Sequence, residues 1–399
     1  MKIQCSLIVV FVLLMSEVVF GQNARFSQIG SAPLMLNPSL SGRFDGKLRV
    51  GSLLSWQQTT YSTTYREATM AHQNFFVDFK FGKYRNIGDE EKYDSTRKIK
   101  VKAGKKPKEE AKDETVRSKR YLGYWSAGFN FYHYGTDIFG IYDKQGPIKA
   151  SFYSLTLARH FYLRNNRYIG VAGQATYADG KVDGTGGKNS YFDQEISGNG
   201  FKFDSSTNMF RANSVASGHY WDFNIGTYFG IVTDQLALEL GISMAHLFYP
   251  QTNIITNDHD LNQRHRITLH SVVRFKLASQ WAIVQKNIFW QEGLYYRSKN
   301  YNDQLQFREL YVGVELYKTF INSEFNLNFG GYTRSFRTLM PYINLGLGKC
   351  VNLRFSYEFP INSKKYSAYT ANRTELGLFY SFRKRTPTGI RMYDKLNYW

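Results

Sequence analysis

The densest group of side chains that could bind a metal lies in the stretch NDHDLNQRHRITLH, residues 257–270. It holds Asp258, His259, Asp260, His265 and His270, and carboxylates and imidazoles are the ligands that zinc uses in proteins. Their spacing matches no established ligand pattern, and none of the 8 histidines of the chain belongs to a His-Glu-x-x-His motif. We therefore predict no metal site and no cofactor.

Two other stretches resemble a phosphate-binding or a catalytic motif and fail on their details. DGTGGKNS, residues 183–190, has Val182 where a phosphate loop needs its first glycine and Asn189 where it needs Ser or Thr. GISMA places Ser243 in mid-strand, without the strand-to-helix turn that exposes a nucleophile. The sequence predicts no enzyme, although a lipid-modifying enzyme with a Ser/His pair assembled in space stays an open alternative.

The elements that carry these residues are revealed by LALELGISMAHLF, residues 236–248. Large apolar residues from Leu236 to Met244 alternate with small or polar ones, among them Glu239 and Ser243. Alternation with a period of two indicates a β-strand with two different faces. We expect the large apolar face to meet lipid and the small, polar face to meet the lumen of a barrel.

The same alternation recurs in fourteen segments, most of them longer than the usual strand of a soluble protein and long enough to cross a membrane at a tilt. Fourteen is even, as in bacterial outer-membrane barrels, whose short periplasmic turns alternate with longer outer loops. The connections follow that rhythm, except for a long one at 80–120 and a short one at 335–338. We predict an all-β, antiparallel, up-and-down transmembrane barrel with strands near 47–56, 66–79, 121–135, 152–163, 168–179, 220–233, 236–248, 266–277, 281–293, 307–320, 324–336, 338–349, 352–361 and 373–382.

The N-terminus predicts export. Lys2 precedes an apolar run at 5–15, and Val19 and Gly21 suit a signal-peptidase site, so residues 1–21 read as a signal peptide. Cleavage would leave Cys350 as the one cysteine, so we expect no internal disulfide. The net charge of +19 favours an anionic partner or reflects a solvated basic insertion, and export argues against nucleic acid.

Three segments outside the strands could contact other proteins. We predict a periplasmic leader at 22–46, the barrel at 47–382 with a charged periplasmic insertion at 80–120, and a periplasmic tail at 383–399. The insertion is too charged to bury a core, so it is a solvated loop or a docking arm, and the tail binds a partner or is disordered. The candidate docking residues are Lys98, Lys100, Lys102, Lys105, Lys106, Arg383, Lys384 and Arg385.

Residues 25–42 of the leader contain two prolines and two glycines, which argue against a strand and for a segment that plugs or braces the barrel mouth. Its residues RFSQ, followed by Asn-Pro-Ser-Leu-Ser-Gly at 37–42, resemble the opening of the PorP/SprF family of Bacteroidetes outer-membrane proteins, with Ser39 in place of the usual Ala. The stretches at 265–293 and 330–336 and the final strand ELGLFYSF also resemble this family. The motif positions are Phe26, Ser27, Gln28, Asn37, Pro38 and Gly42.

The resemblance implies a non-enzymatic component of type IX secretion and gliding motility in the cell outer membrane. It implies contacts with outer-membrane lipids, with a periplasmic peptidoglycan-binding lipoprotein and ring components, and with a large secreted surface protein or adhesin. The barrel would link that machinery to export or surface anchoring of the secreted protein through its C-terminal domain. A passive porin is the alternative, because a barrel of this size can leave an open lumen.

Overall fold

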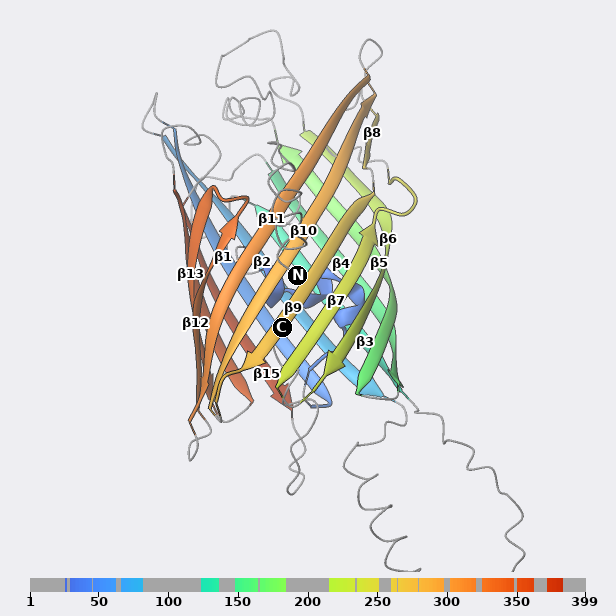
Figure 1. Ribbon diagram of the computed structural model, residues 1–399. Helices are drawn as coiled ribbons and strands as arrows, with labels where there is room; N and C mark the ends of the chain where they lie inside the picture. Colours follow the sequence, from blue (N-terminus) through green and yellow to red (C-terminus); the bar gives the residue numbers. More distant parts are fainter. Residues whose placement is uncertain are drawn as a thin grey trace, which may run out of the picture.

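The computed structural model describes residues 26, 29–44, 46–61, 66–81, 123–135, 148–163, 166–183, 215–233, 235–250, 260–263, 265–278, 280–297, 302–320, 325–347, 350–361 and 372–382. Their dominant feature is a wall of long antiparallel strands (Figure 1). The strands are β1 (Leu48–Tyr61), β2 (Arg66–Phe81), β3 (Tyr124–Gly135), β4 (Ile148–Leu163), β5 (Arg167–Asp183), β6 (Val215–Val232), β7 (Leu236–Ala245), β8 (Asp260–Gln263), β9 (Arg266–Lys276), β10 (Trp281–Arg297), β11 (Asn302–Thr319), β12 (Asn326–Arg334), β13 (Thr338–Leu347), β14 (Val351–Pro360) and β15 (Asn372–Phe382).

The wall closes into a barrel because the first strand pairs with the last. Leu48 of β1 lies opposite Phe382 of β15, and β10 pairs with β11 to complete the ring. Each of the remaining long strands pairs with its neighbours in the sequence. Closure satisfies the backbone groups that a hydrocarbon environment would otherwise leave without partners.

The predicted fold class is confirmed: the ring is an antiparallel barrel, and each of the fourteen predicted segments corresponds to one long strand. The additional strand, β8, lies at residues expected to form a loop. It pairs with β10 beyond the point where β9 begins, so it extends the wall on that side without adding a member to the ring.

The two faces of the wall also follow the predicted alternation. On β7, Leu240 and Ile242 are exposed on the outside, whereas Glu239 and Ser243 are buried inside. On β11, Val314 faces outward and Glu315 inward, and on β15 Leu376, Leu378, Tyr380 and Phe382 share the outer face. The outer face is therefore an apolar band suited to lipid, and the chain is an outer-membrane barrel.

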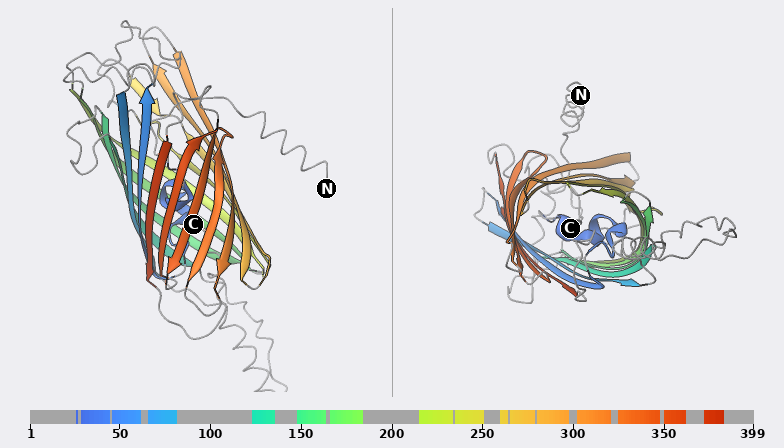
Figure 2. Two further views of the ribbon diagram at one scale, coloured as in Figure 1. Left: turned by 90° about the vertical axis from the view of Figure 1, so that its left-hand side faces the viewer. Right: turned by 60° about the horizontal axis from the view of Figure 1, so that its bottom comes forward.

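Three short helical turns precede β1: η1 (Ile29–Ser31), α2 (Pro33–Leu36) and η2 (Pro38–Leu40). Among the described helices, none has the length and apolar character needed to cross a membrane. We call residues 29–44, which include all three turns, the plug, because they lie inside the ring of strands (Figure 2).

Candidate functional site

The plug owes its shape to two prolines and one asparagine. Pro33 begins α2 and Pro38 begins η2, the first helical positions at which the missing N–H of proline costs nothing. Asn37, between the two turns, has an extended backbone, and its Oδ1 accepts hydrogen bonds from the backbone N (2.9 Å) and Oγ (2.6 Å) of Ser39. The sequence Asn-Pro-Ser thus folds back on itself and reverses the chain within the lumen.

Asn37 also joins the plug to the wall. Its Nδ2 donates to the backbone carbonyls of Thr227 on β6 (3.1 Å) and Ile242 on β7 (3.2 Å), and it lies 3.0 Å from Nε2 of His270 on β9. Gly226 makes the approach possible, since a Cβ there would lie 2.0 Å from Oδ1 of Asn37. One buried amide therefore contacts three adjacent strands.

Ser41 and Gly42 form the second anchor of the plug. The carbonyl of Ser41 accepts from Oγ of Ser126 (2.9 Å) and lies 2.8 Å from Nε2 of His160. Because a carbonyl can only accept, Nε2 of His160 must carry the proton, and in the neutral ring Nδ1 then accepts from the hydroxyl of Tyr228 at 2.8 Å. The two side chains hold a peptide bond of the plug.

Gly42 is required at its position for two independent reasons. Its φ of +71° lies in the left-handed region, and a Cβ would approach Cβ of Ser126 to 2.5 Å. Its backbone N donates to Oδ2 of Asp78 (2.7 Å), and its carbonyl accepts from the hydroxyl of Tyr124 (3.0 Å). The glycine of the Asn-Pro motif therefore lets the backbone itself dock on β2 and β3.

Arg43 provides the charged anchor of the plug. Its Nε (2.9 Å) and Nη2 (2.6 Å) both donate to Oε2 of Glu239 on β7, and Nη2 also donates to the hydroxyl of Tyr168 at 2.8 Å. The guanidinium lies over the ring of Tyr168, 4.8 Å from its centroid. Arg43 and Glu239 are both buried, so each depends on the other for charge compensation.

A second ion pair supports the same end of the plug from the wall. Arg49 on β1 makes a two-point contact with Asp78, through Nε to Oδ1 (2.9 Å) and Nη2 to Oδ2 (2.8 Å). Since Asp78 also accepts from Gly42, its carboxylate is shared between wall and plug. Nζ of Lys80 donates to the carbonyl of Phe44, where the plug leads into β1.

Apolar contacts fill the space between these anchors. Leu34 is fully buried with Phe76 and Phe379, and Leu36 and Leu40 pack in a larger cluster with tyrosines such as Tyr168 and Tyr228. Tyr228 is buried inside the lumen. The plug therefore has an apolar core of its own as well as polar anchors.

The predicted motif residues divide into those that the structure places and those outside the described residues. Phe26 is fully buried, edge-on to the rings of His72 and Tyr132, and Asn37, Pro38 and Gly42 belong to the plug. Ser27 and Gln28 lie outside the described residues, as do all the candidate docking residues: Lys98, Lys100, Lys102, Lys105, Lys106, Arg383, Lys384 and Arg385.

Sequence reasoning missed the charged anchor Arg43 and the wall residues that contact the plug, chiefly Asp78, His160 and Glu239. The available signal was a charge or an imidazole on the inward face of a transmembrane strand, where it needs a compensating group. That signal marks the residue without naming its partner, since Arg43 and Glu239 lie 196 positions apart.

The described lumen contains a Ser/His contact, Ser126 Oγ to His160 Nε2 at 3.1 Å. Both residues are buried and both contact the carbonyl of Ser41, so the pair clamps the plug and lies away from the lipid interface. Among the described residues, no three or more His, Cys, Asp or Glu side chains could together hold a metal ion. Of the histidine-rich stretch, His270 faces Asn37 and His265 contacts the carbonyl of His246.

Several solved barrels align with the chain at low identity. A mutant of the monoaromatic hydrocarbon channel TodX covers 89% of this chain and 95% of its own, with 9% identity and a TM-score of 0.48. The toluene transporter TbuX of Ralstonia pickettii covers 92% and 97%, with 10% identity and a TM-score of 0.45. The translocator domain of autotransporter NalP from Neisseria meningitidis covers 89% and 96%, with 11% identity and a TM-score of 0.38.

Comparisons of sequence are more specific. A search of curated proteins found no match. A family profile matches residues 119–380, which is most of the barrel, and it describes the type IX secretion system membrane protein PorP/SprF.

Proposed function

This chain belongs to the PorP/SprF family of type IX secretion system membrane proteins, and from that membership we propose how the plugged barrel serves secretion. It links periplasmic machinery to the export or surface anchoring of a secreted protein, through the C-terminal domain of that protein. The proposal gives the barrel no catalytic step.

The observation that carries the proposal is the plug. A passive porin needs a water-filled lumen, whereas here residues 29–44 lie in the lumen on buried anchors, with Asn37, Gly42 and Arg43 each contacting the wall. Two of these anchors, Asn37 and Gly42, are motif positions that resemble the family. Because residues of the family motif occupy the lumen, they favour a role in the secretion machinery over a role as a pore for passive diffusion.

We propose that the two ends of the barrel bind different partners. Outer loops receive the C-terminal domain of the secreted protein. Basic residues on the periplasmic side contact a peptidoglycan-binding lipoprotein and ring components, because clustered Lys and Arg attract acidic partners. The insertion at 80–120 and the tail at 383–399 are the proposed contact segments.

The test is affinity purification of the tagged protein from native outer membranes in mild detergent, followed by mass spectrometry and by conductance measurements in planar bilayers. We expect a periplasmic lipoprotein and a large surface protein to co-elute, and the purified barrel to conduct poorly. A barrel that elutes without partners and conducts ions steadily would refute the proposal and identify a porin.

Two variants, in which basic residues are replaced by uncharged Gln, locate the periplasmic contact. One changes five lysines of the insertion to Gln, and the other changes the three basic residues at the start of the tail to Gln, so each serves as the control for the other. Loss of the lipoprotein from one variant, with the surface protein retained, assigns the contact to that segment. The residues changed are Lys98, Lys100, Lys102, Lys105 and Lys106 in the first variant, and Arg383, Lys384 and Arg385 in the second.

A further inference from the structure

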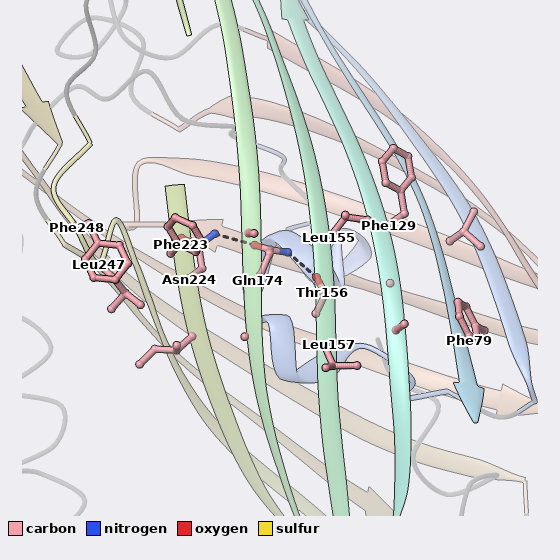
Figure 3. A pocket seen from close by; sticks show the side chains of 16 residues that line it. Phe79, Phe129, Leu155, Thr156, Leu157, Gln174, Phe223, Asn224, Leu247 and Phe248 are labelled. Atoms are coloured by element: carbon pink, nitrogen blue, oxygen red, sulfur yellow. Dashed lines mark hydrogen bonds between the residues drawn. The ribbon is translucent and has the colours of Figure 1, made fainter. Parts of the chain in front are cut away.

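Amide side chains on strands β5 and β6 turn into the barrel. Gln174 donates through Nε2 to Oγ1 of Thr156 (2.9 Å) and to the carbonyl of Leu34 in the plug (3.1 Å), and Nδ2 of Asn224 donates to Oε1 of Gln174 (2.8 Å). All three polar side chains are buried, and the outer face over them is a groove lined mainly by apolar residues such as Leu155 (Figure 3). These amides therefore find partners inside, whereas the outer face presents apolar groups to lipid.

Strand β10 departs from this arrangement. Its residues Lys286 and Ile288 are buried on the inner face, so Gln285 and Asn287 face outward. Gln285 is exposed, and no hydrogen bond joins its side-chain amide to the part of the chain that the structure describes. Nδ2 of Asn287 donates to Oγ of Ser271 on the neighbouring strand β9 (3.1 Å). Two amides thus lie on the face that meets lipid.

The two amides lie at membrane depth. β10 begins at Trp281 on the short-turn side of the barrel, where Nζ of Lys318 lies 4.7 Å from the centroid of the indole ring. Gln285 and Asn287 follow four and six residues later. At about 3.4 Å per residue and a strand tilt of about 40°, they are about 10 and 16 Å above this belt, near the middle of an apolar band about 25 Å tall.

Apolar side chains surround the amides on the outer face. On β10 itself, Ile283 lies below them and Phe289 above them. Leu269 on β9 lies opposite Phe289, and Val314 on β11 lies opposite Gln285 and is 51% exposed. The polar residues are therefore enclosed by apolar surface and do not belong to a polar rim. We call the enclosed residues, Ser271, Gln285 and Asn287, the amide patch.

Lipid is a poor neighbour for the amide patch. Acyl chains neither donate nor accept hydrogen bonds, so an amide that lacks a partner in hydrocarbon is costly. Another protein can supply the missing partner, and polar side chains at membrane depth do form hydrogen bonds across protein contacts. Gly331 on β12 lies opposite Val314 and adds no side chain, which leaves the surface beside Gln285 shallow enough for a close approach.

We propose that the amide patch is the centre of a contact between two copies of this chain in the outer membrane, related by a two-fold axis. The amide group favours a second copy because it carries both donors and an acceptor, so Gln285 can donate to and accept from the same residue of its copy. Neither the patch nor the outward residues that enclose it carry a charge. The surface therefore offers no charge complementarity to a different partner.

The experiment detects a second copy in native outer membranes. Two differently tagged copies of the full chain carry a photo-crosslinking phenylalanine in place of Val314. Because adjacent strands are about 4.8 Å apart, a two-fold axis through Gln285 brings the two 314 positions to about 10 Å from each other. The control site is Val171, which is also exposed and lies four residues from the start of β5, as Gln285 does on β10. We expect position 314 to join the two tags and position 171 not to.

Gln285→Leu tests the amide itself. Leucine suits the lipid face, so the barrel should fold with no loss of stability in urea. We expect the crosslink from position 314 to fall about tenfold, as the loss of one hydrogen bond across a membrane contact implies. The matched control is Gln73→Leu, which removes an outward amide on β2, opposite His133, and should leave the crosslink unchanged.

Three outcomes would overturn the proposal. A crosslink from position 314 to lipid alone, or to a different protein, would show that a second copy is not the occupant. Equal crosslinks from positions 314 and 171 would reflect random collision in the membrane. A crosslink that Gln285→Leu weakens no more than Gln73→Leu does would show that the amide patch does not hold the contact. The proposed function is tested separately, by co-purification.

Discussion

Breaking the ion pair between Arg43 and Glu239 should release the plug. Both side chains are almost fully buried and share two hydrogen bonds of 2.6 and 2.9 Å. Removing one partner of a buried ion pair costs about 3–5 kcal/mol, whereas replacing both with apolar residues is often close to neutral. Arg43→Met and Glu239→Met should each raise the undocked fraction of the plug by about 10²- to 10⁴-fold, and the double variant should raise it far less.

The assay measures the undocked fraction through a cysteine in the plug. Ala32, which is fully buried, is changed to Cys in a Cys350→Ser background, and its reaction rate with a membrane-impermeant maleimide is compared across the four proteins of the cycle. Non-additivity is the expected signature of a pair in contact. If the double variant reacts as fast as the two single effects combined predict, the two residues act independently and the reasoning about the charged anchor is wrong.

Three further changes probe the other anchors and the lipid face. Gly42→Ala should destabilise the docked plug by about 1–2 kcal/mol through the left-handed backbone and by about 1–3 kcal/mol through the close contact with Ser126. The control is Gly173→Ala, whose Cβ enters open space and which should leave the maleimide labelling rate unchanged. Asn37→Ala should raise that rate about ten- to a hundredfold through lost buried hydrogen bonds, and no change would show that the contacts with the wall are dispensable. Leu240→Arg on the outer face should lower the urea stability of the barrel in vesicles by about 2–4 kcal/mol, whereas an effect equal to that of Leu240→Ala would place that face away from lipid.

The barrel could be predicted from the sequence because lipid imposes one rule on every strand. Alternation at residues such as Leu240, Val314 and Leu378 reports the environment of each side chain directly, without reference to any other strand. Strand ends were less accurate: β6 begins at Val215, where a start at residue 220 was predicted, because residues 215–219 (Val-Ala-Ser-Gly-His) show no alternation of large apolar side chains.

The candidate site could be predicted only in part, because it depends on pairs of residues that are distant in sequence. Proline and glycine showed that the leader is not a strand, and the resemblance singled out Asn37 and Gly42. Neither observation could reveal that Asn37 contacts carbonyls on β6 and β7, or that Cβ of Ser126 lies 2.5 Å from the place that a Cβ on residue 42 would take. Those facts arise from strand register, which the period of a single strand does not contain.

The position of the plug in the chain constrains the order in which the molecule folds. The plug is made before every strand, yet its partners extend to Arg354, whose Nη1 donates to Ser31 across 323 positions. Contacts of such long sequence separation form late, because the intervening chain must first be ordered. β1, which follows the plug directly, closes the ring against β15, so the plug is tethered at the last seam to form. We therefore expect docking and closure to occur together late in folding, and substitutions in the plug to slow maturation of the barrel even where they leave the finished wall intact.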